Sequence, residues 1–179
     1  WGLVHGISVD LSGKECPAAP AAKHNAVIVS DTEEIVWSRE RENKGLWTLN
    51  TPNVKFVTGY PEQRVVSLGE IQIAIGQTRL NWAALSLVSR WGNGFGGKGK
   101  ASVLLAATGV SENRGTTKTA QGGDRVTIRD QWGEGVQCEG IPATLAINGG
   151  HAVRCYALDG AGVRQCSVPV ASTAQAATS

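Results

Sequence analysis

The residues of this chain best suited to bind a ligand are aromatic side chains in Gly-rich segments. Trp91 and Phe95 lie in the segment 91–100, and Trp132 lies in a second such segment, 131–139. A large rigid ring covers the C–H face of a sugar, and polar groups around it bind the sugar hydroxyls. These three side chains are therefore candidate platforms for a carbohydrate. The alternative is that each of them fills one end of a folded domain.

Two polar segments supply candidate hydrogen-bonding groups. Glu112, Asn113 and Arg114 follow an apolar run, and Asp130 shortly precedes Trp132. If both segments lie at one rim of the fold, they form a polar cleft that fits a sugar. One alternative is a set of exposed ion pairs, which contribute little to stability. Another is a structural calcium site, because such rims offer carboxylate and carbonyl ligands; no other cofactor is expected.

The sequence has no catalytic motif. The histidines His5, His24 and His151 are isolated, and no G-x-S-x-G surrounds a serine. The glycines of segment 91–100 lack the G-x-x-x-x-G-K-[ST] sequence of a phosphate-binding loop. A glycosidase needs two opposed carboxyl groups, and 15 acidic residues allow many pairs to be nominated. We therefore expect a non-catalytic chain, with a hydrolase as the least favoured alternative.

Composition limits the classes of partner. The formal charge of +2 is small and scattered along the chain, which argues against nucleic acid. No apolar run is long enough for a membrane-spanning helix. The 179 residues suffice for one domain with a hydrophobic core, and we expect a monomer. Methionine is absent, so we expect a processed product or a domain of a longer protein.

The four cysteines favour disulfides and secretion. Cys155 and Cys166 flank a segment that reads as a strand, a four-residue turn at 159–162 and a second strand. That register places the two cysteines directly opposite each other, within the span of a disulfide. Cys16 and Cys138 remain, and a bridge between them would be worth about 4–5 kcal/mol. The alternative is four reduced cysteines in a cytosolic protein. None of the cysteine spacings is C-x₂-C, so we do not expect a structural zinc site.

The elements that must position the candidate binding residues are short apolar runs separated by turn residues. Turn signals recur about every 8–12 residues without helical periodicity, which predicts an all-β domain over 1–170. We expect a two-sheet antiparallel β-sandwich of the jelly-roll type, with a flexible tail or linker over 171–179. Segments 91–100, 115–123 and 131–139 are expected loops, the first of them flexible. The expected strands are 2–11, 26–29, 34–37, 46–50, 54–59, 65–68, 70–75, 82–88, 102–108, 125–129, 141–147, 153–158 and 163–170. Tryptophans in strand patterns are each expected to fill one end of the sandwich: Trp37, Trp47 and Trp82.

Several segments resemble a pattern found near the C-termini of secreted bacterial glycoside hydrolases. Segment 30–60, SDTEEIVWSRERENKGLWTLNTPNVKFVTGY, has a Ser-Asp-Thr turn, a strand ending in Trp, a charged turn, an alternating strand and Thr-Pro. Further similar segments are LLAATGVSENRG (104–115), Trp132-Gly133, IPATLAI (141–147) and YALDGAGVRQCSVPV (156–170). The order and spacing of these segments fit across roughly three quarters of the chain.

The resemblance implies an accessory domain similar to a carbohydrate-binding module, which would target an attached glycoside hydrolase to plant or microbial polysaccharide. The implied partners are a polysaccharide or oligosaccharide and the attached catalytic domain. The alternative is a structural accessory domain that docks on the catalytic module and binds no glycan. Segment 91–95 stands where the pattern has a Ser-Leu-Asp-Gly type of turn, and the cysteines are not part of the pattern. The aromatic loop is therefore the expected place for a specificity private to this chain.

Overall fold

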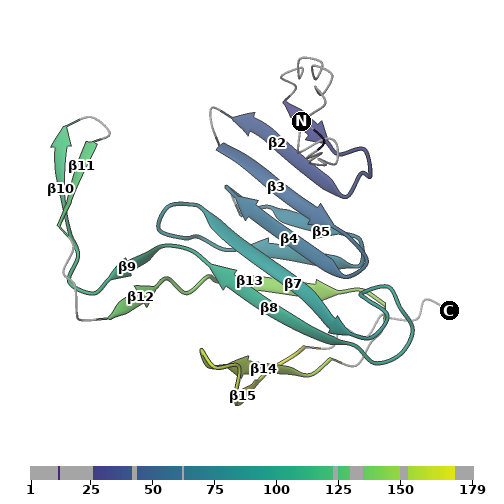
Figure 1. Cartoon of the computed structure of the whole chain (residues 1–179). Coiled ribbons are helices and arrows are strands. Elements are labelled where there is room, and N and C mark those ends of the chain that lie inside the picture. Colours follow the sequence, from purple (N-terminus) through teal and green to yellow (C-terminus); the bar gives the residue numbers. More distant parts are fainter. Residues whose placement is uncertain are drawn as a thin grey trace. The chain divides into compact units, whose positions relative to one another are not determined.

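The structure, a computed structural model, describes residues 12, 26–41, 44–61, 63–122, 125–129, 135–149 and 153–171, and all its regular elements in these ranges are β-strands (Figure 1). None of the described segments forms a helix long and apolar enough to cross a membrane. The chain divides into two compact units, Trp1–Ala146 and Ile147–Ser179. The strands are β1 (Val27–Val29), β2 (Ile35–Arg41), β3 (Lys44–Asn50), β4 (Val54–Gly59), β5 (Val65–Leu68), β6 (Ile71–Ile75), β7 (Ala83–Trp91), β8 (Ser102–Thr108), β9 (Ser111–Asn113), β10 (Thr117–Gly122), β11 (Arg125–Arg129), β12 (Val136–Cys138), β13 (Ala143–Ile147), β14 (Cys155–Leu158) and β15 (Arg164–Val168).

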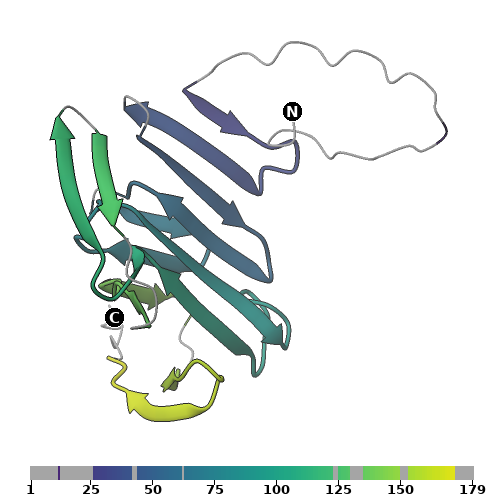
Figure 2. The ribbon, with the colours of Figure 1, turned by 60° about the vertical axis from the view of Figure 1, so that its left-hand side comes forward.

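The larger sheet of the first unit has six antiparallel strands in the order β1-β2-β3-β4-β7-β8 (Figure 2). Side chains alternate between the two faces of a strand, and the register places Val57 of β4 directly opposite Leu85 of β7. Both are buried. The neighbouring positions in these strands therefore point to the other side of the sheet, which we call the outer face.

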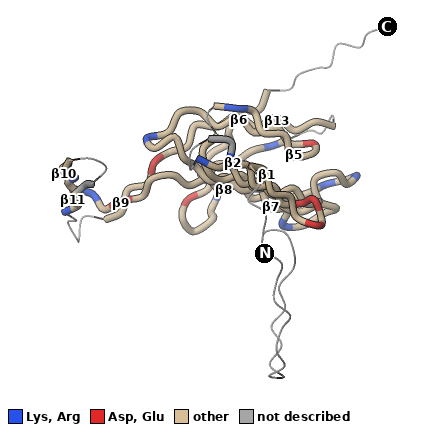
Figure 3. The backbone as a smooth tube through the Cα atoms, turned by 90° about the horizontal axis from the view of Figure 1, so that it is seen from above, with Lys and Arg blue, Asp and Glu red and all other residues tan. Residues whose placement is uncertain are grey.

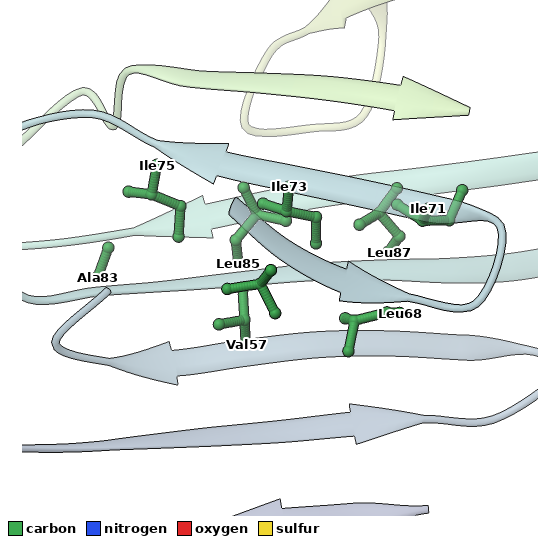
Figure 4. Packing of buried hydrophobic residues seen from close by; sticks show 9 residues of the cluster. Val57, Leu68, Ile71, Ile73, Ile75, Ala83, Leu85 and Leu87 are labelled. Carbon is green, nitrogen blue, oxygen red and sulfur yellow. The ribbon is translucent and has the colours of Figure 1, made fainter. Parts of the chain in front are cut away.

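The smaller sheet, in the order β13-β6-β5, supplies the other half of the core. Ile71, Ile73 and Ile75 alternate along β6 and are buried against residues of β4 and β7 (Figure 4). Full burial of such a side chain is worth about 1.5–3 kcal/mol. Two sheets with an apolar layer between them form a β-sandwich, so the predicted fold class is confirmed.

Two smaller ladders, β10–β11 and β9–β12, correct the prediction of loops at 115–123 and 131–139. β10 pairs with β11 from Thr117 opposite Arg129 onward, although every residue of β10 is exposed. The three residues of β12 are also exposed. These strands are defined by backbone pairing and bury no apolar face, so no alternation of apolar and polar residues marked them in the sequence. Segments 2–11 and 172–179 lie outside the described residues.

The hairpin of the second unit has a different register from the one expected. Cys155 lies opposite Val168, and Cys166 lies opposite Ala157. There are two causes: the loop is wider, so that Leu158 pairs with Arg164, and the register shifts again between Leu158 and Ala157. Within the loop, the Asp159 carboxylate accepts hydrogen bonds from two backbone N–H groups. The predicted direct opposition of Cys155 and Cys166 is therefore wrong.

The three described cysteines, Cys138, Cys155 and Cys166, are free thiols. Cys138 lies opposite Ser111 in the β9–β12 pair, and its Sγ is 3.2 Å from the Ser111 hydroxyl oxygen. Cys16, the expected partner of Cys138, lies outside the described residues. Neither expected disulfide is formed in this structure.

Candidate functional site

The aromatic loop 91–100 is fastened to the turn between β3 and β4. The backbone N–H of Phe95 donates to the carbonyl oxygen of Pro52 at 2.9 Å. Within the loop, the Asn93 side-chain amide donates to the carbonyl oxygen of Lys98 at 3.1 Å. The first bond ties the loop to this turn and the second lies within the loop, so the segment has defined hydrogen-bonded contacts. The expected flexibility of this loop stays a prediction.

Gly94 explains how the loop approaches the turn so closely. Its φ of +74° lies in the left-handed region, and an added Cβ would collide with the carbonyl oxygen of Pro52. The same Cβ would also lie close to the Asn53 side-chain oxygen. Glycine is thus required here both by backbone conformation and by space.

The two aromatic side chains of this loop have different surroundings. Trp91, at the end of β7, is 57% exposed. Phe95 is half-buried and packs against the hydrophobic core. Of the two candidate platforms in this loop, Trp91 therefore lies on the surface, whereas Phe95 helps to close the sandwich.

A buried lysine lies beneath Phe95. Lys55 is 3% exposed and occupies the β4 position two residues before Val57, directly opposite the buried Leu87. Its ammonium group lies 5.4 Å from the centre of the Phe95 ring. The sequence analysis does not identify Lys55, although a lysine at an inward position of an alternating strand is a usable signal.

The Lys55 ammonium group has two polar neighbours. It donates to the Asn50 side-chain oxygen at 2.6 Å and lies 3.6 Å from Glu70 Oε2. The other carboxylate oxygen, Oε1, is buried and accepts no hydrogen bond from the described residues. A charged cluster thus closes the end of the sandwich on which the aromatic loop rests.

Glu112 is occupied by ion pairs. Its Oε1 accepts from Arg79 Nη1 at 2.8 Å and its Oε2 accepts from Lys118 Nζ at 2.5 Å. Hydrogen bonds from Lys118 and Arg79 lower the pKa of the Glu112 carboxyl to about 2, and the bond to Glu112 raises the pKa of Arg79. The carboxylate therefore has an ion-pairing role, as one of our alternatives for this segment anticipated.

The predicted polar cleft at 112–114 is separated from Trp91. Trp91 lies opposite Ser102, whereas Thr108 at the other end of β8 lies opposite Ala84. Because Glu112 follows Thr108 in the chain, the two groups of candidates belong to opposite ends of the β7–β8 pair.

The remaining residues of that cleft have backbone contacts. The N–H of Arg114 donates to the carbonyl oxygen of Gly135, and the carbonyl oxygen of Asn113 accepts from Thr116. Asp130 and Trp132 lie outside the described residues, so their part in a cleft stays a prediction.

Loop 76–82, which precedes β7, is held on two sides. The backbone N–H of Arg79 donates to Glu139 Oε1 at 2.6 Å. The N–H of Gly76 donates to the carbonyl oxygen of Pro142 at 2.7 Å. The Arg79 ion pair adds a third link, so the loop has a defined position at this end of the sandwich.

Two hollows border loop 76–82. One, of about 210 Å³, adjoins the ion pairs of Glu112. The other has a volume of about 230 Å³. Its wall is formed mainly by polar side chains, together with Gly76: Lys44, Tyr60, Pro61, Gln63, Gln77 and Asn81. The sequence did not reveal this second hollow, because its residues come from three separate segments.

The described geometry offers a surface indole and a hollow lined by amides. Both can contact a hydroxylated ligand by stacking or hydrogen bonding.

Within the described ranges, no group of three or more His, Cys, Asp or Glu residues is placed to hold a metal ion. Comparison of the chain with protein-family models, with curated proteins and with solved structures finds no significant match.

Proposed function

We propose that the chain is a non-catalytic carbohydrate-binding accessory domain of a secreted polysaccharide-degrading enzyme. The observation that carries the proposal is the more than half-exposed Trp91 at the base of a loop fastened by hydrogen bonds. A binding segment whose backbone is ordered before binding loses less conformational entropy when a ligand stacks on its aromatic ring. Trp91 therefore acts as the platform for one sugar ring of a polysaccharide.

The charge distribution agrees with a neutral ligand. Lys and Arg are interspersed with Asp and Glu along the described chain, as Figure 3 shows. Binding to a strongly charged polymer would favour a patch of one sign. Lys98 and Lys100 belong to the aromatic loop and are exposed. Their ammonium groups are available as hydrogen-bond donors for sugar hydroxyls.

Affinity gel electrophoresis and calorimetry with β-glucan, xylan, mannan and galactan test the proposal. We expect binding to at least one polymer, a loss of at least about tenfold in Trp91→Ala, and near-normal binding in Trp91→Phe, which keeps a ring. Val136→Ala is the control, since Val136 is 68% exposed and lies in β12, outside both proposed sites. No binding to any polymer, or full binding by folded Trp91→Ala, would contradict the proposal.

The outer face of the six-stranded sheet favours a second function, docking on the attached catalytic domain. Trp37 and Trp47 lie opposite each other on this face, and the Trp47 ring packs edge-on against Phe56 at 5.5 Å. The expectation that these tryptophans fill the sandwich is therefore wrong, because Leu46, not Trp47, points to the core. Such an apolar sheet surface is typical of an interface.

A pair of neighbouring leucines tests this second function. Leu104 lies opposite Val88 on the outer face, and both side chains are exposed. Leu104→Glu should abolish co-purification with the catalytic domain when that domain is expressed as a separate chain. Leu105→Glu, the matched control, places the same charge on the opposite face of β8 and should leave co-purification intact. Equal effects of the two variants would overturn docking through this face.

A further inference from the structure

The 230 Å³ hollow beside loop 76–82 is lined by three side-chain amides. Gln63 precedes β5, whereas Gln77 and Asn81 follow β6. None of the three amides hydrogen bonds to another residue within the described part of the chain. Each amide carries two donors and an acceptor oxygen. The set therefore matches hydroxyl groups, which also donate and accept.

Two of these residues have an uncommon backbone conformation. Gln63 and Asn81 have φ values of 59° and 53°, in the left-handed region that non-glycine residues seldom adopt. At Asn81 the conformation belongs to a defined turn, since its N–H donates to the carbonyl oxygen of Thr78 at 3.2 Å. The Thr78 hydroxyl in turn donates to the carbonyl oxygen of Trp82 at 3.0 Å. The Asn81 amide is thus carried by a backbone of fixed shape.

Tyr60 supplies an aromatic wall to the same hollow. Its backbone N–H donates to the carbonyl oxygen of Gly45 at 3.0 Å. The preceding Gly59 has a φ of +120°, and a Cβ there would collide with the Gly45 carbonyl oxygen. This close approach of β3 and β4 fixes the backbone at Tyr60. An aromatic side chain beside amides is the combination that contacts both the C–H face and the hydroxyls of a sugar.

We propose that this hollow binds one ring of a neutral sugar, as a second site at the opposite end of the sandwich from Trp91. Its volume lies below the roughly 300–1,000 Å³ of pockets for drug-sized ligands, which limits the ligand to a single ring. The residues that line it in the described structure include one cation, the exposed Lys44, and no carboxylate. The inference rests on the proposed function for the class of ligand, a sugar. The hollow and the Trp91 site share no residue.

Chemical-shift titration of the ¹⁵N-labelled chain with D-glucose, D-galactose, D-mannose and D-xylose tests the site. We expect the side-chain amide signals of Gln77 and Asn81 to shift with at least one sugar, independently of any shift in the 91–100 loop. Loss of one hydrogen bond weakens affinity about fivefold. We therefore expect the combined Gln77→Ala and Asn81→Gly variant to weaken the affinity about 25-fold. Glycine at position 81 removes the amide and tolerates the positive φ.

Two further variants separate this site from Trp91. Gln72→Ala removes an exposed amide from β6, outside the hollow, and should bind as the unmodified chain does. Trp91→Ala should lose polysaccharide binding yet keep the monosaccharide shifts at Gln77, so that failure of one site is visible without the other. D-glucuronate is titrated in addition, as a charged comparison. If none of the four neutral sugars shifts these amide signals, or if only D-glucuronate does, a neutral-sugar site is overturned. The unmodified chain alone gives that result, even if the double variant fails to fold.

Discussion

Arg79 Nη1 and Glu112 Oε1, 33 residues apart in the chain, form a hydrogen-bonded ion pair of 2.8 Å. The pair joins loop 76–82 to β9. The backbone of Arg79 is also bound, through its N–H, to Glu139. One residue thus links the loop to two later segments, and the same loop carries Gln77 and Asn81 on the proposed sugar site.

The Glu112 ion pairs predict a pH dependence of stability. The pKa of Glu112 is lowered from 4.5 to about 2 in the folded chain. Its stabilising contribution is therefore complete above the unfolded pKa near 4.5 and is lost as the pH falls toward 2. Urea midpoints measured across this window should fall more steeply for the unmodified chain than for Glu112→Gln.

A matched carboxylate provides the control for this prediction. Glu33 is exposed and has no ion pair among the described residues. Glu33→Gln should follow the pH profile of the unmodified chain. Added salt should reduce the difference caused by Glu112→Gln, because it screens exposed charges. Parallel profiles for the unmodified chain and Glu112→Gln would show that the ion pairs do not stabilise the fold.

The Lys55–Glu70 contact predicts a coupling that a double-mutant cycle can measure. Lys55→Met keeps the apolar stem but leaves the Glu70 carboxylate without its cation. We expect a loss of about 1–3 kcal/mol in the free energy of unfolding, because Glu70 is only partly buried. Adding Glu70→Gln should recover part of the loss in a urea titration. Strictly additive effects would mean that the two charges do not interact.

Gly94 and Gly99 form a natural pair for testing how the aromatic loop is docked. Both have positive φ, but an added Cβ collides with Pro52 only at Gly94, and nothing lies within 4 Å at Gly99. Alanine at either position strains the backbone by about 1–3 kcal/mol. Gly94→Ala should therefore lower the melting temperature more than Gly99→Ala. It should also increase quenching of Trp91 fluorescence by iodide, measured as a difference from Trp91→Phe. Equal melting temperatures would show that the loop is not docked on the turn.

The hairpin register predicts the state of two cysteines. Because Cys155 lies opposite Val168 and not opposite Cys166, both thiols should be alkylated by iodoacetamide without prior reduction. Peptide mass spectrometry of the alkylated chain measures this directly. A cross-linked Cys155–Cys166 peptide would instead support the register expected from a four-residue turn.

Strands were predictable where burial leaves a pattern in the sequence. The alternating isoleucines of 71–75 and the run at 54–59 were assigned correctly, because one face of each strand is buried. The run at 102–108 was also assigned correctly, from its apolar residues, although nearly all of them are exposed. The exposed strands β10 and β12 were missed, since backbone pairing requires no particular side chains. The hairpin of β14 and β15 was predicted, but its register depends on the loop around Asp159 and on a register shift between Ala157 and Leu158.

The sequence by itself determined the all-β class, most of the core strands and the presence of an aromatic residue, Trp91, in a Gly-rich loop. These properties follow from local periodicity and residue type. Only the tertiary structure decided that Phe95 packs on the core above Lys55 and that Glu112 is engaged in ion pairs. It also decided that amides from distant loops line one hollow. Such relationships join residues far apart in the chain, so they depend on strand order and register, which no local pattern encodes.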